Sequence, residues 1–246
     1  MPVLAHLSDT HLDGGQLRLD RLRRAVGEAA SAGADAVIVT GDLTDHGAAA
    51  EYEQFASAMP ADRPWLATVG NHDRREPARA CLLPGSSGPL DRVLDIAGLR
   101  LIALDSLVEG VPEGRLAAES LEFAAWALDG SPGPAVIALH HPPVAVGHEV
   151  IDRLGLREPE GLAELGRHPR LAAILTGHVH TSLAARFAGA PLLGAGGVAS
   201  TMRLGSKTDP VADEGAVPAF AVHVFDDAGW VRTVFHPLAP VPVPAR

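Results

Sequence analysis

The chain has 246 residues, the length of one domain or of one domain with a small appendage. Its net charge of −10 argues against a nucleic-acid polymer as partner, and its single cysteine, Cys81, excludes a disulfide framework and every multi-cysteine metal site. Apolar runs are too short for a membrane span, whereas twelve histidines beside one lysine direct attention to metal ligands.

Strand and helix signals alternate in the first part of the chain. Short apolar runs predict strands, and apolar residues at helical spacing predict helices between them, which is typical of a largely parallel sheet. The first predicted strand follows the initiator methionine almost directly and leaves no targeting segment, so we expect a cytoplasmic location. The predictions are strands Val3–Ser8, Ala36–Thr40 and Trp65–Val69, and helices Leu17–Ser31 and Ala48–Met59.

The rest of the chain is richer in strand signals. We expect an α/β fold with two packed mixed β-sheets flanked by helices, in a single domain over residues 1–246. A strand-rich part at about 183–236 is expected to complete the second sheet. The predictions are helix Leu116–Leu128 and strands Arg92–Ala97, Leu99–Asp105, Ala135–Leu139, Leu171–Thr176, Leu183–Ala188, Pro191–Gly194, Ala219–Asp226 and Trp230–Pro237.

Aspartate, asparagine and histidine residues stand directly after five predicted strands. Because ligands bind at the carboxyl ends of strands in α/β sheets, segments far apart in sequence can meet there and pool their side chains. In D-x-H and H-x-H the two polar residues are two positions apart, so in extended chain both face the same cavity. The segments are Asp9-Thr10-His11, Gly41-Asp42-Leu43-Thr44-Asp45, Gly70-Asn71-His72-Asp73, His140-His141-Pro142 and Gly177-His178-Val179-His180.

The pooled side chains suit metal ions. Carboxylate, amide and imidazole donors without a thiolate fit Mn, Fe, Zn or Co. The candidate ligands are too many for one ion, and they fit two ions that share one carboxylate. These candidates are Asp9, His11, Asp42, Asn71, His140, His178 and His180.

The five segments, in this order, resemble the D-x-H, G-D-x-x-D, G-N-H-D, H-x-P and G-H-x-H blocks of the calcineurin-like metallophosphoesterase superfamily. The stretch from His140 to His180 resembles more closely the bacterial class III cyclic-nucleotide phosphodiesterases and glycerophosphodiesterases. The blocks span Asp9 to His180, and the C-terminal third aligns only loosely. The resemblance implies a four-layer α-β-β-α sandwich and a dinuclear metal centre.

The resemblance implies a role for each matched residue. Asp42 would bridge the two ions and, with His72, carry the catalysis, while Asp73 or Asp45 would orient neighbouring imidazoles. The side chains that face the substrate would be Asn71, His72, His11 and His180. The first metal would be held by Asp9, His11, Asp42 and His180, and the second by Asp42, Asn71, His140 and His178.

The function implied is that of a dimetal-dependent phosphodiesterase. Its substrate would be a small phosphodiester, either a 3′,5′-cyclic nucleotide such as cAMP or a glycerophosphodiester, and a metal-bridging hydroxide would attack phosphorus. One alternative is a phosphomonoesterase or pyrophosphatase with the same site. The other is a non-catalytic metal-binding scaffold, which predicts missing ligands, whereas every expected position is filled. We expect no contact with a membrane. We expect the protein to form a homodimer.

Some residues keep two interpretations at this stage. His141 either orients a ligand or contacts the substrate. The glycine-rich stretch Gly194–Thr201 either cradles a phosphate or bends beside the metal site. Five histidines are interpreted as ordinary strand or loop residues, namely His6, His148, His168, His223 and His236.

Overall fold

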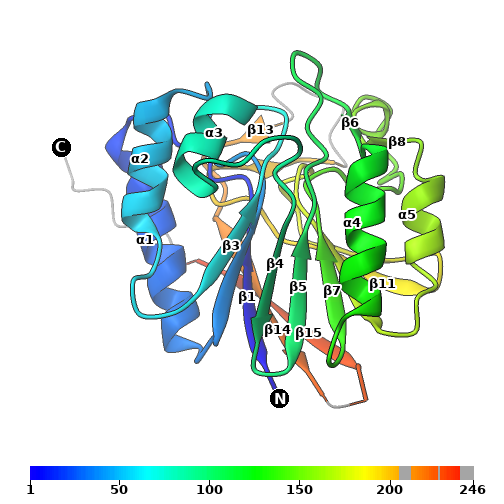
Figure 1. Cartoon of the computed structure of the whole chain (residues 1–246). Helices are drawn as coiled ribbons and strands as arrows, with labels where there is room; N and C mark the ends of the chain where they lie inside the picture. Colours follow the sequence, from blue (N-terminus) through cyan, green and yellow to red (C-terminus); the bar gives the residue numbers. More distant parts are fainter. Residues whose placement is uncertain (205–211, 227, 239–246) are drawn as a thin grey trace.

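A computed structural model describes residues 1–204, 212–226 and 228–238, and it shows two β-sheets packed between two groups of helices (Figure 1). This arrangement confirms the predicted α/β fold with two packed mixed sheets. Within the described ranges, no helix is long and apolar enough to cross a membrane. The helices are α1 (Gln16–Ser31), α2 (Ala49–Ala58), α3 (Arg75–Leu82), α4 (Ala118–Asp129) and α5 (Glu160–Leu165), with a 3₁₀ turn at Ile151–Arg153.

The first sheet has five strands and contains the N-terminal part of the chain. These strands are β1 (Val3–Leu7), β2 (Ala36–Thr40), β3 (Trp65–Thr68), β14 (Ala219–Phe225) and β15 (Val231–Pro237). Their order is β15-β14-β1-β2-β3, in which β1, β2 and β3 are parallel and the two C-terminal strands are antiparallel. Every residue of β2 is buried, as expected for a parallel strand covered on both faces.

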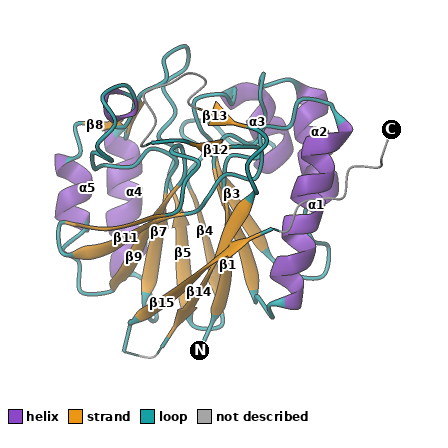
Figure 2. Cartoon of the chain, turned by 180° about the vertical axis from the view of Figure 1, so that it is seen from behind, coloured by secondary structure: helices purple, strands orange, loops and turns teal. Residues whose placement is uncertain are grey.

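The second sheet has six strands, and its four central strands are parallel. The strands are β4 (Arg92–Ile96), β5 (Leu99–Ala103), β7 (Ala135–Ala138), β9 (Leu171–Thr176), β10 (Leu183–Phe187) and β11 (Ala190–Gly194). Their order is β10-β11-β9-β7-β5-β4, with antiparallel hairpins at both edges. All parallel strands of both sheets therefore end at one side of the molecule, which positions the turns that follow them (Figure 2).

Three apolar clusters hold the layers together. One joins α1, α2 and α3 to the first sheet, a second lies between the two sheets, and a third joins α4 and α5 to the second sheet. Side chains alternate along each strand, so a central strand contributes to two clusters at once. On β1, for example, Leu4 packs between the sheets, whereas Ala5 and Leu7 face the helices.

The C-terminal part requires one correction. The sequence-based assignment of residues 183–236 to the second sheet is wrong for β14 and β15, which pair with β1 in the first sheet. Pairing of β14 with β1 links the two ends of the chain, and local periodicity carries no signal for such a contact. Elements that the sequence did not predict are α3 and the two-residue strands β6 (Gly114–Arg115), β8 (Leu156–Arg157), β12 (Thr201–Met202) and β13 (Ala212–Asp213).

Candidate metal centre

The predicted site residues lie in the turns that follow β1, β2, β3, β7 and β9. Five of them have a φ angle between 42° and 70°, a backbone conformation that residues other than glycine rarely adopt. Such strain persists only where the surrounding structure holds it, and it is typical of functional turns. The residues concerned are Asp9, His11, Asp42, His178 and His180.

Close packing of the turns explains two motif glycines. The N–H of His11 donates to the carbonyl of Asp42 over 2.9 Å, so the first two turns lie directly against each other. A Cβ atom at Gly41 would lie 2.6 Å from Nδ1 of His140, and one at Gly70 would collide with the carboxylate of Asp42. These positions require glycine because neighbouring site residues occupy the space of a side chain.

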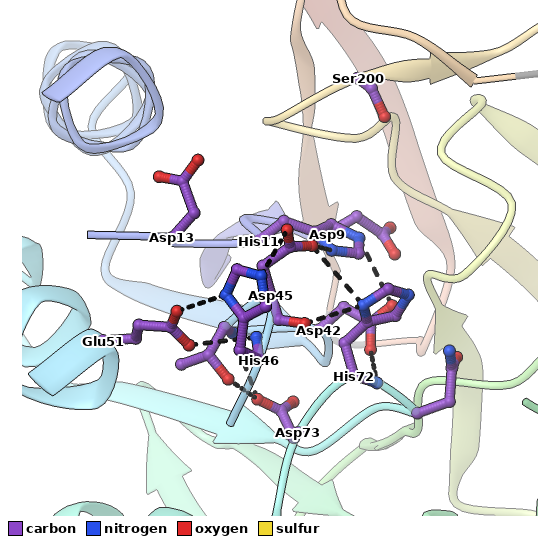
Figure 3. A network of polar contacts seen from close by, with 12 residues as sticks. Asp9, His11, Asp13, Asp42, Asp45, His46, Glu51, His72, Asp73 and Ser200 are labelled. Carbon is purple, nitrogen blue, oxygen red and sulfur yellow. Dashed lines mark hydrogen bonds and ion pairs between the residues drawn. The ribbon is translucent and has the colours of Figure 1, made fainter. Parts of the chain in front are cut away.

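The first cluster consists of Asp9, His11, Asp42 and His180, all of them buried. Nε2 of His11 lies 3.4 Å from Oδ2 of Asp42 and 3.2 Å from Nε2 of His180. Nε2 of His180 lies 3.3 Å from Oδ1 of Asp9. One potential ligand atom of each residue therefore lies within 4.8 Å of those of the other three. Figure 3 shows Asp9, His11 and Asp42 gathered at this place.

The second cluster shares Asp42 with the first. Nε2 of His140 lies 3.3 Å from Oδ2 of Asp42 and 3.2 Å from Oδ1 of Asn71. Nδ1 of His178 lies 3.3 Å from the same His140 nitrogen. The same Asp42 oxygen thus stands between the two clusters, at nearly equal distances from an imidazole of each. The structure brings together all seven predicted ligands.

The contacts within both clusters fit cations. The nitrogens of His11 and His180, and those of His140 and His178, face each other at 3.2 to 3.3 Å. Two neutral imidazole lone pairs at such distances repel unless a proton or a metal ion lies near both. Among the described residues, Oδ2 of Asp9 and Nε2 of His178 are buried without a hydrogen-bond partner. Oxygen and nitrogen donors of this kind suit divalent metals.

The protonation states of Asp42 and His178 also suit metal binding. Burial alone would raise the pKa of the Asp42 carboxyl, but the imidazoles of His140 and His11 hold it well below its usual range. Burial and the neighbouring His140 lower the pKa of His178 to about 3. Ionised carboxylate and neutral imidazole are the forms that bind metals. Burial also disfavours the charged form of His140, yet Asp42 raises the pKa of this histidine to about 9, so a metal there would displace a proton.

The ligand imidazoles are oriented by their second nitrogen. Nδ1 of His180 lies 2.8 Å from Oγ of Ser200, and Nδ1 of His140 lies 2.7 Å from the carbonyl oxygen of Thr40. Each contact directs Nε2 toward its cluster, as is typical of metal-binding histidines. The sequence reasoning missed Ser200 and Thr40, because only the fold brings them to these rings.

Asp45 orients His11, one of the two possibilities that the sequence left open. Nδ1 of His11 lies 2.9 Å from Oδ1 of Asp45 (Figure 3). A guanidinium nitrogen of Arg18 lies 2.9 Å from Oδ2 of Asp45. The hydrogen bond from His11, with help from Arg18, holds the pKa of Asp45 well below its usual range. Arg18 is a further residue that the sequence reasoning missed, since it lies within an otherwise ordinary amphipathic helix.

Asp73 has a different task from Asp45. Its carboxylate accepts hydrogen bonds from the backbone N–H groups of Leu43, Thr44 and Gly70 and from the hydroxyl of Tyr52. Among the described residues, its partners are N–H groups and hydroxyls rather than imidazoles. Asp73 therefore fixes the turns that carry the ligands, and the expectation that it orients a ring is not met.

His72 lies at the mouth of the site. Its side chain is 42% exposed, and its ring centroid lies 4.6 Å from that of His11. Nδ1 of His72 lies 3.1 Å from the carbonyl oxygen of Asp45, and the backbone N–H donates to Oδ1 of Asp42 over 2.9 Å. The ring is thus anchored beside the first cluster while its other edge is free to face a ligand.

His141 lies behind the second cluster. Its side chain is buried, Nδ1 lies 2.8 Å from Oγ of Ser106, and its ring centroid is 4.9 Å from that of His178. Burial lowers the pKa of His141 well below its usual range, so the ring is neutral. A ring without solvent exposure disfavours direct contact with a substrate. Nε2 of His141 is buried without a hydrogen-bond partner among the described residues, and His141 groups with His140 and His178 as a further potential metal donor.

The glycine-rich stretch Gly194–Thr201 bends beside the first cluster. The N–H groups of Gly197, Val198 and Ala199 donate to the carbonyls of His180, Ser8 and Asp9. These groups are engaged with the chain itself, so the stretch is interpreted as a packed bend rather than as a phosphate cradle.

Comparison with known proteins agrees with this geometry. A protein of Mycobacterium tuberculosis (strain CDC 1551 / Oshkosh) named a cAMP/cGMP dual specificity phosphodiesterase is 36% identical over 260 residues, which cover 97% of this chain and 79% of that protein. The Pseudomonas aeruginosa 3′,5′-cyclic adenosine monophosphate phosphodiesterase CpdA is 32% identical, over 72% of this chain and 69% of that protein.

Solved structures share the fold at lower identity. A crystal structure of a dimetal phosphatase from Danio rerio superposes with a TM-score of 0.70 and 15% identity, covering 94% of this chain and 98% of that one. Residues 2–182, which include every predicted ligand, match the model of the calcineurin-like phosphoesterase family. The chain therefore belongs to the calcineurin-like phosphoesterase family.

Proposed function

We propose that the protein is a two-metal phosphodiesterase that hydrolyses a small phosphodiester, a 3′,5′-cyclic nucleotide or a glycerophosphodiester. One observation carries the proposal: two clusters of metal-ligand side chains, buried except for the half-buried Asn71, share Oδ2 of Asp42, which lies 3.4 Å from Nε2 of His11 and 3.3 Å from Nε2 of His140. A shared carboxylate between two donor sets is what two neighbouring ions require.

Each cluster has its own ligand set. Two divalent or trivalent ions, such as Mn, Fe, Zn or Co, would polarise the phosphoryl oxygens and lower the pKa of a water molecule, which supplies the nucleophile. The first ion would be held by Asp9, His11, Asp42 and His180, and the second by Asp42, Asn71, His140 and His178.

The remaining site residues bind and orient the substrate. His72 is partly exposed beside the first cluster, where its ring can meet a phosphate or the leaving oxygen. Since Nδ1 of His72 faces the carbonyl of Asp45, a proton passed to a leaving group would come from Nε2. His11, which lies beside His72 and 3.2 Å from His180, would face the substrate together with His180 and Asn71, and Asp45 keeps the ring of His11 in place.

The substrate class is supported by the relatives and by charge. The two relatives named above, which match 97% and 72% of this chain, are named cyclic-nucleotide phosphodiesterases. A relative from Arcobacter nitrofigilis, named a probable glycerophosphodiester phosphodiesterase GpdQ, is 34% identical over 59% of this chain. This similarity supports a glycerophosphodiester as the other candidate substrate. The net charge of −10 disfavours polyanionic substrates. A cytoplasmic location and a homodimer stay predictions.

A substrate panel tests the proposal. Purified protein with added Mn²⁺ is assayed on cyclic AMP, on bis(p-nitrophenyl) phosphate and on p-nitrophenyl phosphate, with Asn71→Ala as the inactive control. We expect turnover of the diesters and little turnover of the monoester. Preference for the monoester would favour the phosphomonoesterase alternative, whereas inactivity on all three would favour the scaffold. Efficient nicking of plasmid DNA, abolished by Asn71→Ala, would overturn the small-substrate proposal.

A further inference from the structure

Two histidines outside the metal clusters are buried in the core between the sheets. His6 lies on β1 and His223 on β14, and both side chains are inaccessible to solvent. His6 stands two positions from Leu4, and His223 two positions from Phe225. Residues two apart on a strand share a face, and Leu4 and Phe225 belong to the apolar cluster between the sheets, so both rings face that core. Polar rings in such a place depend on their hydrogen-bond partners.

The two rings form the middle of a continuous row of polar contacts. Oγ1 of Thr233 lies 2.8 Å from Nδ1 of His223, whose Nε2 lies 3.1 Å from Nδ1 of His6. Nε2 of His6 lies 2.8 Å from Oγ1 of Thr40. The Thr40 hydroxyl lies 2.9 Å from Oγ of Ser8, which in turn lies 3.1 Å from the Thr40 carbonyl oxygen. The row crosses the first sheet from β15 through β14 and β1 to the end of β2.

Only one direction of donation makes every contact in this row a hydrogen bond. The Ser8 hydroxyl has one hydrogen, so if it donates to the Thr40 carbonyl, the Thr40 hydroxyl has to donate to Ser8. Nε2–H of His6 then donates to Thr40, Nε2–H of His223 donates to His6, and the hydroxyl of Thr233 donates to His223. Both imidazoles are neutral in this arrangement.

The row ends at a candidate metal ligand. The carbonyl of Thr40 accepts the Ser8 hydroxyl and also the Nδ1–H of His140, over 2.7 Å. A carbonyl oxygen has two lone pairs, so it can accept both hydrogen bonds. With Nδ1 occupied in this way, Nε2 of His140 is left to face Asp42.

We propose that His6 and His223 are positioning residues for the metal ligand His140. They act through Thr40, whose hydroxyl they hold and whose carbonyl sets the orientation of the ligand ring. The proposal rests on the proposed function, because it assumes a metal ion at His140. Burial supports it, since burial lowers the pKa of His6 well below its usual range and that of His223 to about 3, which keeps both rings neutral.

Substitution of His6 tests the proposal through metal affinity. His6→Leu removes the donor to Thr40, and we expect about 10–100-fold weaker binding at the second cluster with the first cluster unchanged. His6→Gln carries an amide that can still donate, so it is expected to recover most of the affinity. Titration of the full chain with Mn²⁺, followed by electron paramagnetic resonance, measures both affinities, and His178→Ala identifies the second cluster.

Two control variants separate positioning from general stability. Leu4→Ala leaves a cavity on the same strand and the same face, and it is expected to lower the free energy of unfolding while both Mn²⁺ affinities stay unchanged. Thr233→Val removes the far end of the row and should cost less affinity than His6→Leu. Wild-type affinities in His6→Leu, or an equal loss in Leu4→Ala, would overturn the proposal. A wild-type chain that binds no Mn²⁺ would instead refute the proposed function.

Nuclear magnetic resonance of the wild-type chain tests the row without metal and without a variant. We expect the ¹⁵N signals of His6 and His223 to show neutral rings protonated on Nε2 throughout the range from about pH 5 to 8. Protonation on Nδ1, or titration of either ring within this range, would contradict the proposed row of donors and overturn the positioning role.

Discussion

Buried histidines occur in two regions of this molecule, and they differ in what surrounds them. At the strand ends, the rings of the two metal clusters face carboxylates and one another, with nitrogen–nitrogen distances of 3.2 to 3.3 Å. In the core between the sheets, His6 and His223 face each other and the hydroxyls of Thr40 and Thr233. Both groups are inaccessible or nearly so, and burial alone does not distinguish them.

The difference lies in how the polar atoms are satisfied. Each nitrogen of the core pair, His6 and His223, has a hydrogen-bond partner when both rings are neutral. The strand-end rings instead converge with carboxylates on common centres, and buried Oδ2 of Asp9 has no partner among the described residues. A cation completes the second arrangement and would only disrupt the first. The comparison predicts that substitutions at the strand ends remove metal ions, whereas substitutions of the core pair only weaken the affinity for the ion at His140.

Removal of the shared carboxylate should give the largest effect. In Asp42→Ala both clusters lose the oxygen that stands between them, so we expect loss of both ions and of essentially all activity. His11 belongs to the first cluster only, so His11→Ala should weaken mainly the binding of the first ion. Metal analysis of the purified variants measures this, and an Asp42→Ala protein that retains two ions would refute the shared role of Asp42.

The partly exposed histidine should separate catalysis from metal binding. His72 borders the first cluster, so His72→Ala should keep both ions yet lose about 10²–10⁴-fold in rate, the usual contribution of a positioned acid. A proton-donating role predicts a smaller loss with p-nitrophenolate as leaving group than with an alkyl ester. His46, an exposed neighbour paired with Glu51, provides the matched control, and His46→Ala should stay near the wild-type rate.

Two results would contradict this role of His72. An equal loss on both substrates would point to stabilisation of charge at phosphorus instead of proton donation. Loss of metal from His72→Ala would make the ring a ligand, in line with its grouping beside His11 and Asp45.

The sequence predicted the strand-end region far better than the core region. Ligands such as Asp9, Asp42 and His178 follow short apolar strands directly, so a local pattern together with the geometry of parallel sheets was enough to bring them together. The sequence alone leaves His6 and His223 as ordinary strand residues, because their contact depends on the pairing of β14 with β1, which joins opposite ends of the chain. The same pairing explains why the C-terminal strands were assigned to the wrong sheet.

Substitution of Asp45 should have an intermediate effect on metal affinity, confined to the first cluster. Its carboxylate holds Nδ1 of His11 and is itself held by Arg18, so Asp45→Asn keeps an acceptor oxygen but loses the charge. We expect about 10–100-fold weaker binding of the first ion and little change at the second. Mn²⁺ titration measures both sites, with Arg18→Gln as a milder companion variant. Equal weakening of both ions would show that Asp45 acts on the whole turn rather than on His11.

The last effect concerns the stability contribution of the core pair and is visible only below neutral pH. Burial lowers the pKa of His223 to about 3, whereas an unfolded chain has the ordinary value near 6.5. Between these values the unfolded state binds more protons, so the contribution of His223 to stability is fully present above about pH 6.5 and is lost as the pH falls toward 3. The loss between pH 6.5 and 5 is about 2 kcal/mol.

His223→Gln isolates this contribution because glutamine does not titrate. Urea unfolding of both proteins in the presence of a chelator, at several pH values between about 7 and 5, gives the free energy of unfolding. We expect the wild type to lose stability more steeply, by nearly one proton. The strand-end histidines contribute equally to both proteins, and burial, the main cause of the lowered pKa of His6, keeps that ring neutral in both. Parallel pH dependences would mean that His223 binds protons equally in the folded and unfolded states, and the distinction between a neutral core pair and metal-binding strand ends would then fail.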